Sequence, residues 1–239
     1  MSPEPTDAGG AAVPADAGPS LLQATSGVVS GPLRLVLATA NAHKADEIEA
    51  IVATEGGGWI ELLPRPSDVP DVEETGSTFE ANARLKARAL VAATGVPALA
   101  DDSGLEVDAL AGAPGVRSAR YAGAGASDAD NVALLLAELR ERGALLPEQR
   151  RARFRAVVLV AFPDGGEVVG EGAVEGAIVM APHGAGGFGY DPVFAPDGAG
   201  GRTFAELDPQ DKHRCSHRGR ALRALVVGLG AQRAGLPGA

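Results

Sequence analysis

Two adjacent carboxylates, Asp101 and Asp102, are the residues of this sequence best suited to chemistry. They follow a short apolar run, residues 96–100, and precede Ser103 and Gly104. This order predicts a buried strand that ends in a tight acidic turn. Neighbouring carboxylates repel each other unless a cation lies between them or one takes a proton, and a divalent cation that also binds phosphate would meet that need. On this stretch alone, an ordinary Asp-Ser-Gly turn with solvated acids is the simpler interpretation.

A second polar group lies where the first predicted strand meets the first predicted helix. Residues 33–38 are mostly apolar and predict a strand, and apolar residues at helical spacing predict a helix over residues 42–54. Thr39, Asn41 and Lys44 occupy the turn and the start of that helix. The backbone N–H groups and the dipole of a helix N-terminus attract anions, so this turn suits phosphate. Helix capping by Thr39 and Asn41 explains the same residues and is compatible with phosphate binding.

Glu74 and Lys86 flank the start of the next predicted helix. The sequence Ser77-Thr-Phe-Glu80 matches a capping box, which predicts a helix from Ser77 to about residue 93. Asn82 and Lys86 are four residues apart and therefore share one face of that helix. Glu74 is either a surface acid favoured by the helix dipole or a metal or water contact beside the acidic pair. Lys86 by itself is most simply a solvated helix residue.

Two further clusters lie in the last part of the chain. Phe188 stands between glycines, after the glycine-rich residues 181–187, and its ring can either lie flat against a ligand ring or pack in a turn. The segment from Lys212 to Arg220 is rich in basic residues, and a helix follows to about residue 229, which Ser216 can cap. Because the cluster is short and the whole chain is acidic, a pocket for a small anionic ligand explains it better than a nucleic-acid surface.

The remaining predicted elements form the scaffold that must position these groups. Residues 127–142 carry a helical apolar stripe behind a capping Ser127, and residues 163–166, Pro-Asp-Gly-Gly, mark a hairpin turn. Predicted strands cover residues 59–63, 152–162 and 167–180. Open α/β sheets bind ligands at the carboxyl ends of their strands, which is where the acidic turn and the Thr39 turn are expected.

Composition limits the class of protein. The chain has 239 residues, 45% of them hydrophobic, which suits one domain over about residues 31–235. The formal net charge of −10 argues against a general nucleic-acid or membrane surface, and no apolar run reaches the roughly 18 residues of a spanning helix. Cys215 is the only cysteine, so a reducing compartment fits. Residues 1–30 are rich in Ala, Gly, Pro and Ser and lack basic residues, so we expect a disordered tail and not a secretory signal.

The order of these motifs resembles the inosine triphosphate pyrophosphatase family, also described as dITP/XTP pyrophosphatases. Each motif alone is weak, but so many in one order over about residues 33–229 form a specific signal. The motifs are Thr39-Ala-Asn41-Ala-His-Lys44, Glu74-Thr-Gly-Ser-Thr-Phe79-Glu-Ala-Asn82, Ala100-Asp-Asp-Ser-Gly104, Gly112-Ala-Pro-Gly115, Ser118-Ala-Arg-Tyr121, Gly187-Phe-Gly-Tyr-Asp-Pro192 and Ser216-His-Arg-Gly219.

The resemblance implies a fold and a reaction. The fold would be α/β, with an elongated, twisted, mixed β-sheet, flanking helices and two lobes that enclose a nucleotide cleft. The reaction would be the hydrolysis of purine nucleoside triphosphates such as ITP, dITP and XTP to the monophosphate and pyrophosphate, before these nucleotides enter DNA or RNA. Such enzymes use Mg2+, act in the cytoplasm and are usually homodimers, and neither nucleic acid nor a membrane is a partner.

The resemblance also assigns roles to residues. Asp102 would be the catalytic acid-base residue, and Glu74, Asp101 and Asp102 would contact the metal ion. Phe188 would stack on the base. Cationic or donor side chains beside it would match a 6-oxo purine and leave the amino group of adenine unsatisfied. The substrate contacts would be Thr39, Ala40, Asn41, Ala42, His43, Lys44, Lys86, Ser103, Phe188, Gly189, Tyr190, Asp191, Lys212, His217 and Arg218.

Two other functions remain to be weighed. A nucleotide-binding regulator without turnover would not need to keep Glu74, Asp101 and Asp102 together. A related pyrophosphatase for modified pyrimidine nucleotides is the other alternative, and the motifs at residues 188–191 and 216–218 speak against it. Two features depart from the family pattern: the N-terminal tail, to which we assign no role, and His213, where a neutral polar residue is expected.

Overall fold

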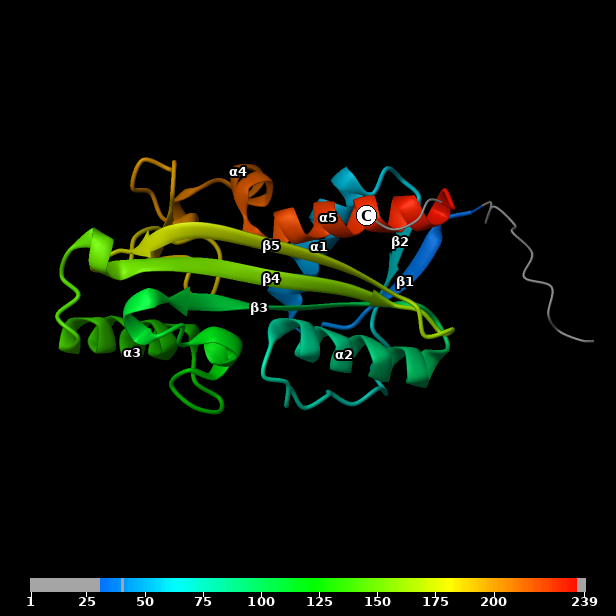
Figure 1. Cartoon of the computed structure of the whole chain (residues 1–239), viewed down its shortest axis with the longest axis horizontal. Helices are drawn as coiled ribbons and strands as arrows, with labels where there is room; N and C mark the ends of the chain where they lie inside the picture. The colour runs from blue at the N-terminus through cyan, green and yellow to red at the C-terminus, as the bar shows by residue number, and fades with distance from the viewer. Residues whose placement is uncertain (1–30, 40, 236–239) are drawn as a thin grey trace, which may run out of the picture.

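The computed structural model describes residues 31–39 and 41–235 (Figure 1). Within these residues, six strands form one sheet in the order β2-β1-β3-β4-β5-β6. β1 pairs in parallel with β2 and β3, whereas β3, β4, β5 and β6 pair antiparallel in succession, so the sheet is mixed. The strands are β1 (Leu33–Leu37), β2 (Ile60–Leu63), β3 (Ala98–Val107), β4 (Arg151–Ala161), β5 (Glu167–Ile178) and β6 (Phe194–Pro196).

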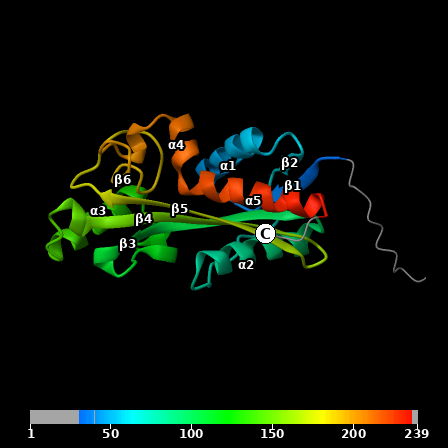
Figure 2. The same ribbon diagram turned by 45° about the horizontal axis from the view of Figure 1, so that its top comes forward.

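Helices cover both faces of this elongated sheet, as Figures 1 and 2 show. On one face, Ile48 of α1 and Leu222 of α5 share an apolar core with Leu99 of β3. On the other face, Ala87 of α2 packs in a second core with Ala100 of β3. The helices are α1 (Ala42–Glu55), α2 (Phe79–Thr94), α3 (Asp128–Glu141), α4 (Pro209–Cys215) and α5 (His217–Arg233), with 3-10 turns at Asp108–Leu110, Gly115–Arg120, Pro147–Arg150 and Phe204–Glu206.

Most of the predicted elements are confirmed, including the elongated mixed sheet with flanking helices. Ser127 caps α3 in a capping box, Ser216 caps α5, and β4 and β5 form the predicted hairpin. The prediction that Ser77 caps α2 is wrong by one residue, because the side chain of Thr78 accepts the backbone N–H at the helix start. The short elements β6 and α4 are not predicted from the sequence.

Two predictions lie outside the described residues: the disordered tail, residues 1–30, and the substrate contact of Ala40. In the described part of the chain, no helix is both long and apolar enough to cross a membrane.

The predicted acidic turn after residue 100 is wrong. β3 continues without a break, and Asp101 and Asp102 pair with Val158 and Val157 of β4 inside a ten-residue antiparallel ladder. Asp, Ser and Gly are poor strand formers, but long-range pairing overrides local propensity. The strand that ends here is β1, whose pairing with β3 stops at Leu99. The acidic pair therefore lies just beyond the carboxyl end of the neighbouring parallel strand, where ligands collect in open sheets.

Close packing of α5 on β5 positions the start of α5 beside the acidic pair. A Cβ atom on Gly172 of β5 would lie 2.2 Å from the carbonyl oxygen of His217, and one on Gly170 would lie 2.3 Å from that of Ala221. Both distances are far below contact distance, so only glycine allows the helix to lie so close to the strand. The contact fixes the position of His217 and Arg218 relative to the sheet.

Candidate active site

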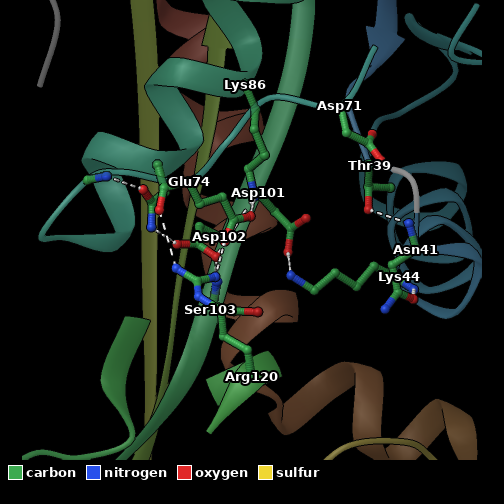
Figure 3. Close-up of polar contacts among 12 residues, drawn as sticks. Thr39, Asn41, Lys44, Asp71, Glu74, Lys86, Asp101, Asp102, Ser103 and Arg120 are labelled. Carbon is green, nitrogen blue, oxygen red and sulfur yellow. Dashed lines mark hydrogen bonds and ion pairs between the residues drawn. The ribbon is translucent and has the colours of Figure 1, made fainter. Parts of the chain in front are cut away.

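The two carboxylates of β3 point to opposite faces of the sheet, because successive side chains alternate along a strand. Asp101 lies on the side of α1 and α5, where its Oδ2 is 3.4 Å from Lys44 Nζ and 3.3 Å from Arg218 Nη2. Asp102 lies on the side of α2, where its Oδ2 accepts a 3.0 Å hydrogen bond from Asn82 Nδ2. Figure 3 shows Lys44 reaching Asp101 from α1 and Lys86 approaching from α2.

Asp101 is held in its charged form. Burial alone would raise the pKa of this carboxyl, but the charges of Lys44, Arg218 and Lys86 outweigh it and hold the pKa well below the usual value. Its second oxygen, Oδ1, is buried and has no hydrogen-bond partner among the described residues. A buried carboxylate oxygen without a partner is costly, which indicates that a further ligand belongs at this oxygen.

Asp102 differs from its neighbour because it binds protons more readily. Burial raises the pKa of its carboxyl, the nearby charge of Glu74 raises it further, and Lys86 and Lys44 offset this rise only in part. Asn82 orients the carboxylate: its Nδ2 donates to Asp102, and its Oδ1 accepts the backbone N–H of Gly76 at 2.8 Å. A carboxylate with a raised pKa and a fixed direction is suited to accept a proton from a reacting group.

Lys86 lies between two carboxylates. Its Nζ is 2.9 Å from Glu74 Oε1 and 3.8 Å from Asp102 Oδ1, so the two acids converge on one cation. Arg120 holds Glu74 from the other side, because its guanidinium donates to Glu74 Oε2 and to the Glu74 carbonyl oxygen, each at 3.2 Å. These ion pairs outweigh the desolvation of Glu74 and lower its pKa.

The same arrangement bears on the expected metal ion. Among the described residues, no three Asp, Glu, His or Cys side chains already lie close enough together to hold one. Glu74 and Asp102 do converge, however, and an ammonium group lies between them. Carboxylate oxygens are the ligands that hard divalent cations prefer, and Asp101 Oδ1 lacks a partner. The donor set therefore fits a small divalent cation that would replace Lys86 as the neutralising charge.

The turn before α1 has the geometry of a capped helix N-terminus. Asn41 Oδ1 accepts the backbone N–H of Lys44 at 3.1 Å, and Thr39 Oγ1 accepts the backbone N–H of Asn41 at 3.2 Å. Asn41 is thus the cap of α1, whereas Thr39 holds the turn before it, and both also line a cavity beside Lys44 and Lys86. Ala42 begins α1, whereas the ring of His43 lies against Phe188.

Two adjoining cavities form the candidate cleft, and they share Asn41, Lys44 and Glu74. The first cavity has cationic walls from Lys44, Lys86 and Arg65. The second contains the aromatic and basic residues of the two C-terminal motifs and reaches Asp102. It is lined, among others, by Ser103, Phe188, Gly189, Tyr190, Asp191, Lys212, His217 and Arg218. The structure therefore brings the described candidate residues together in or beside one cleft, while His213 lines neither cavity.

Glu47 joins the two buried cations of the second cavity, and the sequence analysis does not identify it. Its carboxylate accepts hydrogen bonds from Lys212 Nζ and Arg218 Nη1. Burial opposes the charge of Glu47, but Arg218 and Lys212 outweigh it and lower the pKa. Glu47 lies three residues after Lys44 and so shares its helix face, which is the one signal that could have found it. Arg218 also donates to Ser103 Oγ at 2.9 Å.

The loop that carries Phe188 is held by two acids. Asp191 Oδ2 accepts the backbone N–H of Phe188 at 2.9 Å and also binds Lys212 Nζ at 2.8 Å. Asp128, at the start of α3, accepts the backbone N–H of Gly189 at 2.7 Å and is a second residue that the sequence analysis misses. The loop passes Asp191 so closely that a Cβ on Gly187 would lie 2.1 Å from the Asp191 carboxylate.

Tyr190 and His217 are buried residues that line the second cavity. The hydroxyl of Tyr190 donates to the Ser118 carbonyl oxygen at 2.9 Å, so this buried side chain fixes the loop. The His217 ring stacks on Phe154 with centroids 4.6 Å apart. Burial and the charges of Arg218 and Lys212 lower the pKa of His217 well below its usual value, so the ring is neutral. Its Nδ1 is buried and has no hydrogen-bond partner among the described residues.

Comparison with known proteins assigns this chain to a family. The model of the Ham1 family matches residues 35–227. A dITP/XTP pyrophosphatase of Streptomyces coelicolor is 50% identical over 195 residues, which cover 81% of this chain and 95% of that protein. A dITP/XTP pyrophosphatase of Thermus thermophilus is also 50% identical, over 194 residues, which cover 81% of this chain and 90% of that protein.

Solved structures agree with the sequence comparison. A HAM1 protein from Coxiella burnetii superimposes with a TM-score of 0.74 at 42% identity, covering 83% of this chain and 98% of that one. A nucleoside-triphosphatase, or dITP/XTP pyrophosphatase, from Mycobacterium abscessus superimposes with a TM-score of 0.64 at 47% identity, covering 80% of this chain and 97% of that one. The sequence match and the shared fold both cover most of the chain, which therefore belongs to the Ham1 family.

Proposed function

We propose that this protein hydrolyses ITP, dITP and XTP to the nucleoside monophosphate and pyrophosphate and so removes them from the cytoplasmic nucleotide pool. The observation that carries the proposal is the position of Lys86, which lies between Glu74 and Asp102 in a cleft that also holds Phe188, Lys212 and Arg218. Acids for hydrolysis and an aromatic, cationic pocket for a base thus adjoin each other. The names of the similar proteins support the same reaction.

Asp102 is the residue that we assign to proton transfer. Hydrolysis between the α- and β-phosphates requires an attacking water that loses a proton, and a nearby carboxylate with a raised pKa can accept it. Asn82 keeps the carboxylate directed into the cleft. Glu74, Asp101 and Asp102 are the acids that would hold Mg2+, which when bound supplies positive charge to the phosphates and acidifies a bound water.

Positive charge on the phosphate side comes from Lys44, Lys86 and the N-terminus of α1. The triphosphate is a polyanion, so these groups offset its charge and that of the transition state. Thr39 and Asn41 shape the turn, because their side chains accept the backbone N–H groups of Asn41 and Lys44. Lys44 binds Asp101 of β3 and Lys86 binds Glu74, and phosphate would compete with these acids for the two lysines.

Selection of the base is the task that we assign to the second cavity. A purine would stack on Phe188, and Arg218, Lys212 and His217 would face its edge. A 6-oxo group presents an acceptor to these donors, whereas the 6-amino group of adenine presents another donor. A site built to bond one group rejects an analogue that lacks it by about 10²- to 10⁵-fold. We also propose that the protein acts as a homodimer, as the family resemblance implies.

Pyrophosphate release from a panel of nucleoside triphosphates, with and without Mg2+, tests the proposal. We expect ITP, dITP and XTP to exceed ATP and the pyrimidine triphosphates in kcat/KM, and activity to require the metal. Arg218→Ala should lower kcat/KM for ITP much more than for ATP, because it removes a donor from the base edge. Equal losses on both substrates would assign Arg218 to the phosphates or to structure. Tight ITP binding without turnover by the wild-type protein would instead identify a nucleotide-binding regulator.

A further inference from the structure

His43 contacts the residue on which the base is proposed to stack. Its imidazole ring lies parallel to the ring of Phe188, with an interplanar angle of 15° and centroids 5.7 Å apart. The two residues come from different elements, His43 from the first turn of α1 and Phe188 from the loop before β6. The ring of His43 therefore belongs to the base side of the cleft, and not to the phosphate side that its motif suggests.

The other groups near the Phe188 ring are fixed in place. Lys212 Nζ lies 5.0 Å and Arg218 Cζ 5.8 Å from the ring centroid. Both cations are buried and bind Glu47, and each also binds a second acid, Asp191 or Asp101. His43, in contrast, is exposed to solvent. Of these three neighbours of Phe188, His43 is the one that can move aside at little cost.

The spacing of the two rings is too small for a base but close to what a base needs. An aromatic ring inserted between two others requires a separation of about 7 Å, two stacking intervals of roughly 3.4 Å. The centroids of the two rings are only 5.7 Å apart, and a small rotation of the exposed His43 side chain would supply the missing separation. His43 thus rests where the purine would enter.

We propose that His43 is the movable second wall of the base pocket. Its ring covers Phe188 when the pocket is empty and lies on the opposite face of the purine when the pocket is occupied, so that the base is held between the two rings. The inference rests on the proposed function, because it concerns how that same substrate is held. It assigns His43 to stacking on the base and not to hydrogen bonding with a phosphate. A purine, with two fused rings, gains more from such a sandwich than a pyrimidine does.

Two substitutions separate stacking from phosphate binding. His43→Ala should raise KM for ITP by about 5- to 150-fold, the range that aromatic stacking on a base contributes, and should change kcat little. His43→Phe should retain most of the wild-type KM, because it keeps a ring but has no donor or charge. His183→Ala is the matched control, since that histidine is also exposed but makes no ring contact with Phe188, and it should leave KM unchanged.

Competition experiments give an independent readout. Inosine competes only for the base side of the cleft and pyrophosphate only for the phosphate side, so His43→Ala should weaken inhibition by inosine and leave inhibition by pyrophosphate unchanged. In the full-length wild-type protein, the ring proton resonances of His43 should shift on addition of inosine monophosphate and should lose their upfield ring-current shift in Phe188→Ala.

The outcomes distinguish this inference from the proposed function. Suppose that the wild type hydrolyses ITP but His43→Phe raises KM for ITP as much as His43→Ala does. Then His43 serves the phosphates and the proposed stacking on the base is wrong. The same conclusion follows if His43→Ala weakens inhibition by pyrophosphate and not inhibition by inosine. A His43 resonance that does not respond to inosine monophosphate would refute it as well. Failure of the wild type to hydrolyse any purine triphosphate would refute the proposed function itself.

Discussion

Replacing Glu47 by glutamine is the substitution whose effect on stability follows most directly from this structure. Glu47 binds two buried cations, Lys212 and Arg218, whose side chains are 7% and 2% exposed. Glutamine has nearly the same shape, but it is neutral and has a single acceptor oxygen. Glu47→Gln therefore leaves two positive charges in a site of low dielectric with one carboxylate fewer to neutralise them.

The size of the effect can be bounded from the remaining contacts. Removing one partner of a buried ion pair costs about 3–5 kcal/mol when the other charge is left alone. Here the charges are not left alone, because Lys212 keeps Asp191 at 2.8 Å and Arg218 keeps Asp101 at 3.3 Å. We therefore expect a smaller loss than that range, about 2–3 kcal/mol in the free energy of unfolding. For a domain of this size, about 2–4 °C per kcal/mol gives a fall in Tm of roughly 4–12 °C.

Thermal and urea unfolding of the two proteins measure this difference. The pKa of Glu47 is lowered in the folded protein, so its charge stabilises the fold above the value near 4.5 of an unfolded glutamate, and that stabilisation is lost as the pH falls through the lowered pKa. The difference in the free energy of unfolding between wild type and Glu47→Gln should thus be largest at pH 7 and should decrease below about pH 4.5. Glu49→Gln, on the exposed side of α1, is the matched control and should change Tm by less than about 2 °C.

Two results would refute the reasoning. A Tm of Glu47→Gln within 1–2 °C of the wild type at pH 7, roughly the effect of a surface substitution, would mean that solvent and the remaining acids neutralise both cations without Glu47. A difference that stays constant from pH 7 to pH 3.5 would mean that the loss comes from packing and not from charge.

Two further substitutions test the acids of the cleft. Asp102→Asn should lower kcat by about 10²- to 10⁴-fold while nucleotide binding survives, because the amide keeps the shape but cannot accept the proton; near-normal turnover would remove Asp102 from that role. Arg120→Ala should raise the Mg2+ concentration needed for half-maximal activity by about tenfold, because it frees both the carboxylate and the main chain of Glu74. Arg120→Lys should recover part of this loss, and an unchanged metal requirement in Arg120→Ala would show that Lys86 alone positions Glu74.

Local chemistry made part of the fold predictable from the sequence. Asn41, Ser127 and Ser216 were each expected to cap a helix, and each does so, because a cap is a hydrogen bond over two or three residues. The same locality explains the successful prediction of the hairpin between β4 and β5. α4 has comparable signals, with Asp208 as the cap and Pro209 at the first position, but the segment is only seven residues long.

Features that depend on contacts between residues far apart in the sequence could not be predicted. Asp101 and Asp102 look like a turn when only their neighbours are considered, and ten residues of pairing with β4 make them part of a strand. Glu47 and Asp128 were missed because their partners lie far along the chain: Lys212 is 165 residues from Glu47, and Gly189 is 61 residues from Asp128. Family resemblance supplied most of the candidate residues, but it did not indicate which cations neutralise which acids.

The alternation of side chains along β3 gives the two neighbouring acids different partners. Asp101 faces Lys44 and Arg218, whereas Asp102 faces Asn82 and Lys86, although a single peptide group separates the two acids. The two carboxylates thus lie on opposite sides of one backbone unit. Any tilt of that unit would move both carboxylates together. A deletion or insertion of one residue before Asp101 would exchange the two faces, and each acid would then meet the partners of the other.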